Sequence, residues 1–380
     1  MKRCFLFLLS CLLYTTAQAY NTDNLQISML TVMPRSNEVY TIFGHTALRL
    51  YDPSQQIDIV FNWGTFDFNA PNFMYRFVRG ETDYFLSDTN YMRFMHEYQM
   101  GNSTVVEQIL NLSTEGKEIL LEKLFINLQL ENRVYRYNFL FDNCTTRVRD
   151  LIEQSCSELD YPVQEKTTTF RKLIHSCTEP YPWLTFGIDL LIGAGADSLI
   201  SVRQELFLPV KLEEMLDTTP LVVSSKQVLT AVPEPDSKRK FWESPLITGY
   251  IILLIYAAVA IAGRIKRRPF KGWFAPLFFI TGAGGCLLVF IAFSYHPCTW
   301  PNWNLLWLHP LHLIGFAGCF FRRPRWWVKG YHLLNLVVLA GVLVGWYWIP
   351  QGFNWANLPF LICLGLASLT YFCNVVRRRR

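Results

Sequence analysis

Two residues in this sequence stand in settings that favour nucleophilic catalysis, a histidine and a cysteine. His45 lies in a stretch rich in β-forming residues at 41–51, and Cys144 follows Asn143 where helical periodicity begins. The first turn of a helix leaves backbone N–H groups unpaired, and these groups together with a nearby imidazole lower the pKa of a thiol from about 8.5. We therefore predict that Cys144 is a nucleophile and that His45 serves first as its base and then as an acid.

Further groups must orient the imidazole and stabilise the charge that develops during the reaction. A thiolate paired with an imidazolium needs a third polar side chain, for which Asn62 is the candidate and Asp58 the alternative on the same predicted strand. The free N–H groups at the helix start, beside Asn143 and Thr145, are candidates for holding the oxyanion of a tetrahedral intermediate. An isolated histidine or cysteine is more often a core residue, and only the fold can bring these two together.

The pattern around these residues predicts an α+β domain. Three strands and two helices are expected, at 41–51, 57–63, 133–141, 115–127 and 145–155. The first two strands should form a hairpin, because the residues at 52–54 are Asp, Pro and Ser, which favour turns. The histidine would then lie on a strand and the cysteine at the start of a helix.

The first part of the chain is typical of a signal peptide followed by an exported domain. An apolar stretch at 4–14 follows two basic residues, and Ala-Gln-Ala at 17–19 has the form of a signal-peptidase site, so 1–19 is predicted to be removed. A retained anchor helix is the alternative, but the apolar stretch is shorter than the ~20 residues that a spanning helix needs. The segment 20–243 has no run long enough to span a bilayer and is predicted to be the exported domain.

From 244 to 380 the sequence predicts a membrane domain. Five apolar runs are expected to be spanning helices, at 244–263, 272–293, 304–321, 331–349 and 358–376. Lys and Arg fill the first and third linkers and the tail at 377–380, whereas the second and fourth linkers contain none. Because these residues stay on the cytoplasmic side, we expect a multi-pass protein of the bacterial inner membrane with a periplasmic catalytic domain and a cytoplasmic C-terminus. A smaller basic cluster at 238–240 on the outer flank could contact anionic headgroups.

Charge and cysteine content narrow the function further. The formal net charge of +5 is concentrated in the linkers and tail, so it reports topology and gives no indication of nucleic-acid binding. Cys144, Cys156 and Cys177 fall in the predicted exported domain, and their odd number leaves one thiol free. We predict a Cys156–Cys177 disulfide with Cys144 free, although Cys298 in an outer loop leaves other pairings open. No Cys or His spacing indicates a metal site, and no cofactor is expected.

Two arginines of the exported domain and four residues of the second outer loop and the start of the next apolar run are candidate contacts to a lipid or its headgroup. They are Arg49, Arg147, His296, Asn302, Trp303 and Asn304. Tryptophan rings suit the depth of lipid headgroups, and arginine suits a phosphate, although the two arginines could equally be solvated or paired within the protein. His296, His309 and His312 raise the alternative of a metal site, which the lack of an acidic residue nearby disfavours.

Several of these segments resemble known families. A strand histidine that precedes Asn143-Cys144 at a helix start resembles the circularly permuted NlpC/P60 and LRAT-like branch of the papain-like thiol enzymes. More closely, Phe43-Gly44-His45 and the segments 61–68, 135–139 and 142–150 resemble the lipoprotein N-acyltransferase Lnb family of Bacteroidota. The order of an exported domain and several membrane helices matches as well, so the resemblance spans essentially the whole chain. It implies a permuted papain-like domain followed by an α-helical membrane domain of five spanning helices.

The resemblance also implies an activity. It is transfer of a fatty acyl chain, from a phospholipid donor through a Cys144 thioester, to the α-amino group of the lipidated N-terminal cysteine of diacylated lipoproteins. Position by position, it assigns the nucleophile to Cys144 and the base to His45. Two other functions remain open, namely a membrane-anchored cysteine hydrolase acting as a phospholipase or cell-wall amidase, and a scaffold or receptor that does not need Cys144.

Overall fold

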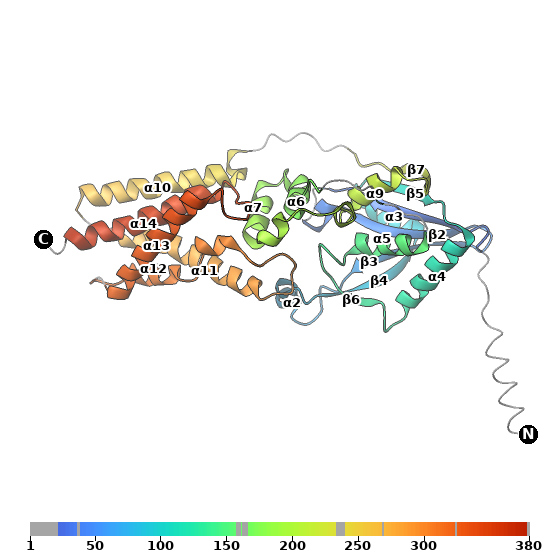
Figure 1. The fold of residues 1–380 in the computed structure, drawn as a ribbon, viewed down its shortest axis with the longest axis horizontal. Coiled ribbons are helices and arrows are strands. Elements are labelled where there is room, and N and C mark those ends of the chain that lie inside the picture. The colour runs from blue at the N-terminus through green and yellow to red at the C-terminus, as the bar shows by residue number, and fades with distance from the viewer. Residues whose placement is uncertain are drawn as a thin grey trace, which may run out of the picture.

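A computed structural model of the chain describes residues 22–35, 39–156, 161, 166–232, 240–267, 270–323 and 325–377. An α+β domain forms one end of the elongated molecule, and a bundle of apolar helices forms the other (Figure 1). The predicted fold class is confirmed at this level. The predicted signal peptide at 1–19 lies outside the described residues.

The α+β domain is built on one antiparallel sheet. Its strands are β1 (Gln26–Val32), β2 (His45–Asp52), β3 (Ile57–Thr65), β4 (Asp83–Asn90), β5 (Val105–Leu110), β6 (Val134–Arg136) and β7 (Val222–Leu229). They pair in the order β6-β4-β3-β2-β1-β5-β7, and each of these pairs is antiparallel. The strand that begins with the candidate base, β2, is therefore held on both sides in the middle of the sheet.

Alternation along the strands gives the sheet two buried faces. The helices that cover them are α3 (Tyr91–Met100), α4 (Thr114–Leu128), α5 (Cys144–Ser155) and α9 (Pro209–Asp217). On one face Leu48 and Phe61 pack with Val148 in a core shared by α4, α5 and α9. On the other face Ala47 packs with Phe94 of α3. Neighbouring residues of β2 thus point toward different helices.

The predicted hairpin is present, with β2 and β3 as direct neighbours. Asp52 Oδ1 accepts a hydrogen bond from Ser54 N at 2.8 Å, which is how an aspartate stabilises a turn. The first strand starts at His45 and not at 41, because Val39–Phe43 form a 3-10 helix. Gly44 then adopts a φ of 78° to turn the chain into β2.

The two predicted helices are α4 and α5, and each agrees with its predicted bounds to within one residue. The third predicted strand, 133–141, was wrong over most of its length, because β6 covers only Val134–Arg136. Asn138 Oδ1 accepts from the N–H groups of Leu140 and Phe141, and this local turn ends the strand. An asparagine side chain that binds nearby N–H groups competes with the hydrogen bonds of a sheet.

Short elements connect the sheet to the bundle. They include α2 (Phe73–Arg79), α6 (Phe170–Thr178), α7 (Pro182–Leu191), η2 (Ala194–Asp197) and α8 (Val202–Glu205). Figure 1 shows α6 and α7 between the sheet and the apolar helices, and α2 beside one end of the bundle. These elements form the boundary between the two parts of the molecule.

The apolar bundle contains four long helices. They are α10 (Pro245–Ile265), α11 (Ala275–Ala292), α13 (Trp326–Gly345) and α14 (Asn357–Arg377). By length and composition three stretches qualify as membrane spans within the described residues, Pro245–Ile265, Lys271–Ala292 and Trp326–Gly345, and Asn357–Phe372 is a shorter apolar helix. Four of the five predicted helical segments are therefore helices.

The prediction of one continuous helix at 304–321 was wrong, because this segment is interrupted. It forms the 3-10 helix η5 (Trp303–Leu306) and, after an irregular stretch, the short helix α12 (His312–Gly318). Pro310 lies in the irregular stretch, where it removes a backbone N–H and disfavours helical conformation in the preceding residue.

This broken segment nevertheless runs back along α11. At its start Asn302 Nδ2 donates to Leu190 O of α7 at 2.8 Å. At its end Phe321 O accepts a hydrogen bond from Lys271 Nζ, just before α11, at 3.4 Å. Irregular backbone at membrane depth is tolerated where neighbouring protein covers it.

The prediction of a Cys156–Cys177 disulfide was also wrong. Both thiols are free, as are Cys144 and Cys298. Cys156 packs against the core beneath the sheet, whereas Cys177 and Cys298 pack against a separate cluster beside α6. The sequence could not distinguish these two environments, because spacing alone does not report which core a cysteine joins.

Candidate active site

His45 and Cys144 meet at one end of the sheet. His45 is the first residue of β2, and Cys144 is the first residue of α5. The next residue of each element is a threonine, and Thr46 Oγ1 lies 3.1 Å from Thr145 Oγ1. This pairing of strand and helix brings the His45 imidazole close enough to the Cys144 thiol for each group to shift the pKa of the other.

The pair favours a thiolate beside an imidazolium. Burial opposes ionisation of Cys144, but the charge and hydrogen bond of His45, with smaller effects of the Thr46 N–H and the Thr145 hydroxyl, lower the thiol pKa to about 7. Burial likewise opposes the charge on His45, yet the Cys144 thiolate and a hydrogen bond to Asn62 raise the pKa of the imidazole. Each partner thus stabilises the charged form of the other.

Asn62 lies where an orienting residue must lie. Its Oδ1 is 3.2 Å from His45 Nε2, so a protonated Nε2 donates to Asn62 and Nδ1 is left for the thiol. Asp58, the alternative, instead binds Arg49 through both carboxylate oxygens at 2.8 and 3.0 Å. Tyr98 of α3 stacks on the imidazole at a centroid distance of 6.5 Å, so the ring is held on a second side.

The oxyanion role predicted for Asn143 and Thr145 is corrected by the geometry of the helix start. Asn143 is the N-cap of α5, and its Oδ1 accepts from the N–H groups of Thr145 and Thr146 at 2.9 and 2.8 Å. Those donors are therefore already bound. Among the described residues none accepts from the Cys144 N–H, which is the remaining donor beside the thiol.

Three tyrosines that no motif singled out share the core against which Cys144 packs, namely Tyr84, Tyr135 and Tyr137. Burial and the nearby Cys144 thiolate raise the pKa of Tyr84 to about 12, and the same causes raise the pKa values of Tyr135 and Tyr137. The rings of Tyr84 and Tyr137 stack with centroids 4.2 Å apart. The spacing of Tyr135 and Tyr137 ahead of Cys144 was a weak signal in the sequence, whereas nothing there linked Tyr84 to the cysteine.

Arg49 and Arg147, predicted as candidate lipid contacts, are paired within the domain. Arg49 is 9% exposed, and its Nη1 donates to Glu107 at 3.0 Å. Arg147 donates to Asp142 at 2.7 Å and lies 4.1 Å from the centroid of the Tyr135 ring. Both guanidinium groups thus have partners within the domain, which is the structural alternative, and a lipid contact for either arginine stays a prediction.

Asn302 and Asn304 bind the exported domain and not lipid. They are 5% and 1% exposed, and their amides donate to Leu190 O at 2.8 Å and to Asp189 O at 2.9 Å. Trp303 between them is half-buried, and its backbone N–H donates to a side chain of the next outer loop. The prediction of headgroup contacts for the two asparagines is therefore wrong, because burial removes them from lipid.

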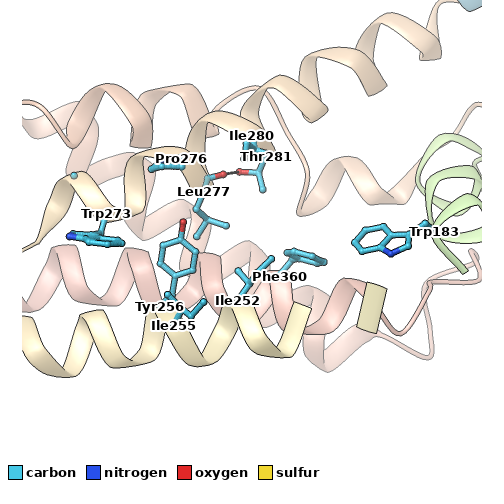
Figure 2. A pocket seen from close by; sticks show the side chains of 11 residues that line it. Trp183, Ile252, Ile255, Tyr256, Trp273, Pro276, Leu277, Ile280, Thr281 and Phe360 are labelled. Atoms are coloured by element: carbon cyan, nitrogen blue, oxygen red, sulfur yellow. Dashed lines mark hydrogen bonds between the residues drawn. The ribbon is translucent and has the colours of Figure 1, made fainter. Parts of the chain in front are cut away.

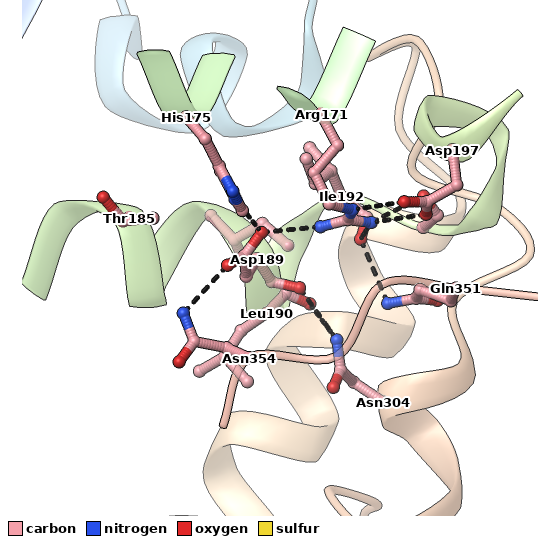
Figure 3. Close-up of polar contacts among 12 residues, drawn as sticks. Arg171, His175, Thr185, Asp189, Leu190, Ile192, Asp197, Asn304, Gln351 and Asn354 are labelled. Atoms are coloured by element: carbon pink, nitrogen blue, oxygen red, sulfur yellow. Dashed lines mark hydrogen bonds and ion pairs between the residues drawn. The ribbon is translucent and has the colours of Figure 1, made fainter. Parts of the chain in front are cut away.

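A buried polar cluster, which we call the joint, surrounds Asp189 at this boundary (Figure 3). Its carboxylate accepts from Arg171 at 2.7 Å, from His175 at 2.8 Å and from Asn354 of an outer loop at 2.9 Å. Arg171 also binds Asp197 at 2.8 Å. Burial opposes the charge of Asp189, but His175 and Arg171 lower the pKa of this carboxyl. The joint thus connects α6 and α7 with the loops of the bundle.

His296 lies between α2 and the outer end of α11. Its Nε2 donates to Phe77 O at 2.8 Å, and its ring faces the Phe77 ring at 6.4 Å. Within the described residues no group of three His, Cys, Asp or Glu side chains is arranged to hold a metal ion.

A cavity of about 770 Å³ lies among the membrane helices, away from Cys144 (Figure 2). Apolar side chains of α10, α11 and α14 line it, and Trp183 of α7 stands at one end. The Thr281 hydroxyl donates to Leu277 O at 2.7 Å, so one of the few polar groups that line the cavity already has a partner. Such a lining suits an apolar chain, but none of the residues named above at Cys144 contributes to it.

Two family models match the chain. The Lnb N-terminal periplasmic domain matches residues 14–176, and the Lnb transmembrane domain matches residues 236–379. The first match contains His45, Asn62 and Cys144, and the two together cover most of the chain. Searches of curated proteins and of solved structures gave no match. The chain therefore belongs to the Lnb family, as a membrane protein with an exported N-terminal domain and a lipoprotein N-acyltransferase-like role.

Proposed function

We propose that this protein transfers a fatty acyl chain from a phospholipid to the α-amino group of the lipidated N-terminal cysteine of diacylated lipoproteins. The observation that carries the proposal is that the start of β2, with His45, meets the start of α5, with Cys144, where the imidazole lowers the thiol pKa to about 7. The match to both Lnb domains supports the same reaction. No cofactor is needed, because the thiol, the imidazole and backbone N–H groups supply every step.

In the first half-reaction, the Cys144 thiolate attacks the ester carbonyl of the phospholipid. The Cys144 N–H is the proposed donor to the oxyanion, because the other N–H groups at the helix start are bound by Asn143. The carbon–oxygen bond of the ester breaks, and the lysophospholipid leaves with a proton from His45. A thioester on Cys144 and a neutral imidazole result.

In the second half-reaction, the neutral α-amine of the lipoprotein attacks the thioester. His45 takes the proton from the amine, the carbon–sulfur bond breaks, and the Cys144 thiolate is regenerated beside an imidazolium. Amine attack must outcompete hydrolysis, and exclusion of water from the apolar surroundings of Tyr84, Tyr135 and Tyr137 supports this selectivity.

The proposed setting is the inner membrane, with residues 20–243 in the periplasm and the bundle of 244–380 in the bilayer. The distribution of Lys and Arg between the linkers supports this orientation, with a cytoplasmic C-terminus. The reacting group of each substrate, the phospholipid ester and the lipidated N-terminus, is held at the membrane by acyl chains. This suits a thiol in a domain that is attached to a bundle of membrane helices.

Mass spectrometry of lipoprotein N-termini tests the proposal. Cells that lack their own N-acyltransferase should yield triacylated N-termini when they express this chain, and diacylated N-termini with Cys144→Ser or His45→Ala. Cys156→Ser is the matched control, because this thiol is half-buried in the same domain and only burial shifts its pKa. It should leave the triacylated product unchanged.

The lipid products distinguish the alternatives. Free fatty acid with diacylated N-termini would identify a hydrolase of the same chemistry. Triacylated N-termini that persist in Cys144→Ser would refute the thioester and show that the acyl chain moves by another route.

A further inference from the structure

Helix α2 presents large apolar side chains to its surroundings. It lies in the connection between β3 and β4, and Phe68, Met74 and Tyr75 are 65%, 70% and 55% exposed there. Neighbouring apolar side chains of this size on a domain surface mark an interaction site. Aromatic rings and methionine also suit the boundary between headgroups and acyl chains, where adaptable apolar contact is needed.

The same helix is fixed at the point where α11 leaves the bundle. The Tyr75 ring lies 6.0 Å from the ring of Phe290, near the last residue of α11. Tyr295 N donates to Arg79 O at 2.8 Å, and His296 binds Phe77 O. Figure 1 shows α2 beside this end of α11. Because α11 is a candidate membrane span, α2 lies at the level of the bilayer surface.

A chain of touching rings, which we call the aromatic row, leads from α2 into the sheet. The centroid distances are 6.0 Å from Phe77 to Phe73, 5.6 Å from Phe73 to Phe66, 4.9 Å from Phe66 to Tyr84 and 4.2 Å from Tyr84 to Tyr137. None of these side chains carries a charge at neutral pH. The row is therefore a continuous line of packed, uncharged rings that leads from α2 into the sheet.

The inner end of the aromatic row is at the nucleophile. Phe66 and Tyr137 pack against the same core as Cys144. Gly64, two residues before Phe66, lies so close that a Cβ added to it would be 3.7 Å from the Cys144 Cβ. One end of the row thus lies on the helix that meets α11, and the other end packs against the core that also holds Cys144.

We infer that α2 dips into the bilayer leaflet that faces the exported domain, and that the aromatic row guides the acyl chain of a phospholipid of that leaflet to Cys144. This inference rests on the proposed function and identifies the route of its acyl donor. The occupant is an acyl chain because the row is apolar over its length and begins beside a membrane span. The same rings would keep the chain out of water while it is bound as the thioester.

Photocrosslinking tests whether α2 enters the leaflet. In the full chain, benzoylphenylalanine replaces Met74, and in a control it replaces Met92, which is 72% exposed on α3 at the far side of the sheet. In vesicles of phosphatidylethanolamine and phosphatidylglycerol, the residue at 74 should crosslink to phospholipid and the residue at 92 should not. Equal crosslinking at both positions, or none at 74, would overturn the placement of α2.

Alkylation of Cys144 tests the route. Two reagents are compared on the full chain in vesicles, water-soluble iodoacetamide and membrane-partitioned N-hexadecyl iodoacetamide, with the Cys144 peptide quantified by mass spectrometry. Phe73→Asp should slow the long-chain reagent by about tenfold or more, because a carboxylate in an apolar path is costly to pass, and leave the iodoacetamide rate within about twofold. An unchanged long-chain rate would refute the route.

A second variant covers the case in which Phe73→Asp disturbs folding and slows both reagents alike. Met74→Asp changes an exposed side chain of α2, so the domain core is untouched, and it should show the same selective loss; Met92→Asp should show none. Alkylation needs no catalysis. If the variants lose long-chain alkylation selectively but the unmodified chain forms no N-acylated product, the proposed function is contradicted and the route is not. If the unmodified chain forms N-acylated product but the variants show no selective loss, the route is contradicted and the proposed function is not.

Discussion

At the scale of single residues, the reactivity of Cys144 is a property of its neighbours. Burial by itself would keep this thiol protonated, and the structure provides His45, the Thr46 N–H and the Thr145 hydroxyl to offset it. Cys156 shows the contrast, since burial raises the pKa of that thiol and no cation lowers it. Two thiols in one domain thus differ in pKa because only one lies beside an imidazole.

Alkylation of Cys144 by iodoacetamide should rise with a midpoint near pH 7 in the full chain, because the thiol is protonated below its pKa of about 7 and reactive above it. His45→Ala removes the imidazolium while burial remains, so the midpoint should move above the ordinary value of about 8.5. Asn62→Ala should move it in the same direction by less, because Asn62 acts through the imidazole. Peptide mass spectrometry at several pH values measures each midpoint.

The thiol of Cys156 is the internal control in each of these samples. Its midpoint should lie above the ordinary range and stay there in all three proteins. An alkylation profile of Cys144 that does not change in His45→Ala would mean that the imidazole does not stabilise the thiolate.

At the scale of elements, the site depends on how β2 begins. Gly44 lies between the 3-10 helix Val39–Phe43 and His45, with a φ of 78° that residues with a Cβ rarely adopt. A Cβ at this position would lie 2.6 Å from Val32 O of the neighbouring strand. Because His45 is the next residue, the turn at Gly44 also determines the backbone position from which the imidazole extends.

Gly44→Ala should destabilise the protein by about 1–3 kcal/mol, since it combines an unfavourable backbone conformation with a contact to backbone. The midpoint of thermal unfolding of the full chain in detergent, followed by tryptophan fluorescence, should fall. Gly187→Ala is the matched control, because this helical glycine has no atom within 4 Å of an added Cβ. It should keep or raise the midpoint, since alanine favours a helix over glycine by about 1 kcal/mol. Equal midpoints for the two variants would argue against strain at Gly44.

At the scale of the whole molecule, the joint holds the exported domain on the bundle. Asp189 and Arg171 have side chains only 2% and 5% exposed, and they bind groups from both parts of the protein. Removing one member of such a buried pair leaves the other charge without its partner, which is costly. The joint thus links α6 and α7 to the loop that holds Asn354.

Asp189→Leu should lower the free energy of unfolding by about 3–5 kcal/mol, because the Arg171 charge and the His175 and Asn354 donors lose their acceptor. The double variant Arg171→Met/Asp189→Leu should lose less than the sum of the two single variants. Glu214→Gln is the control, since its ion pair with Lys211 is exposed and should be worth about 1 kcal/mol or less.

Two readouts separate stability from positioning in the joint variants. Those that remain folded should lose N-acylated product while Cys144 keeps its alkylation midpoint, because the thiol belongs to α5 and the imidazole to β2, and neither is part of the joint. Additive losses in the double variant would mean that Arg171 and Asp189 contribute independently.

Sequence patterns were enough to predict part of the secondary structure and to single out His45 and Cys144 as candidate residues. Periodicity identified α4, α5 and the β2–β3 hairpin, and long apolar runs identified α10, α11, α13 and α14. An asparagine before a cysteine at a helix start, and a glycine before a histidine, are local signals that need no tertiary structure to be read. The pattern at 304–321 failed because hydrophobicity alone does not report that Pro310 breaks a helix.

Only the tertiary structure decided which groups share a site. That His45 faces Cys144, that Asn143 binds the N–H groups expected to serve an oxyanion, and that Arg49 is paired with Asp58 are long-range or competing contacts. The same holds for Tyr84, and for Asn302 and Asn304, whose partners lie in segments far away in the chain. Local sequence specifies backbone preference and residue chemistry, but polar side chains choose among several partners, and burial in the folded chain makes that choice.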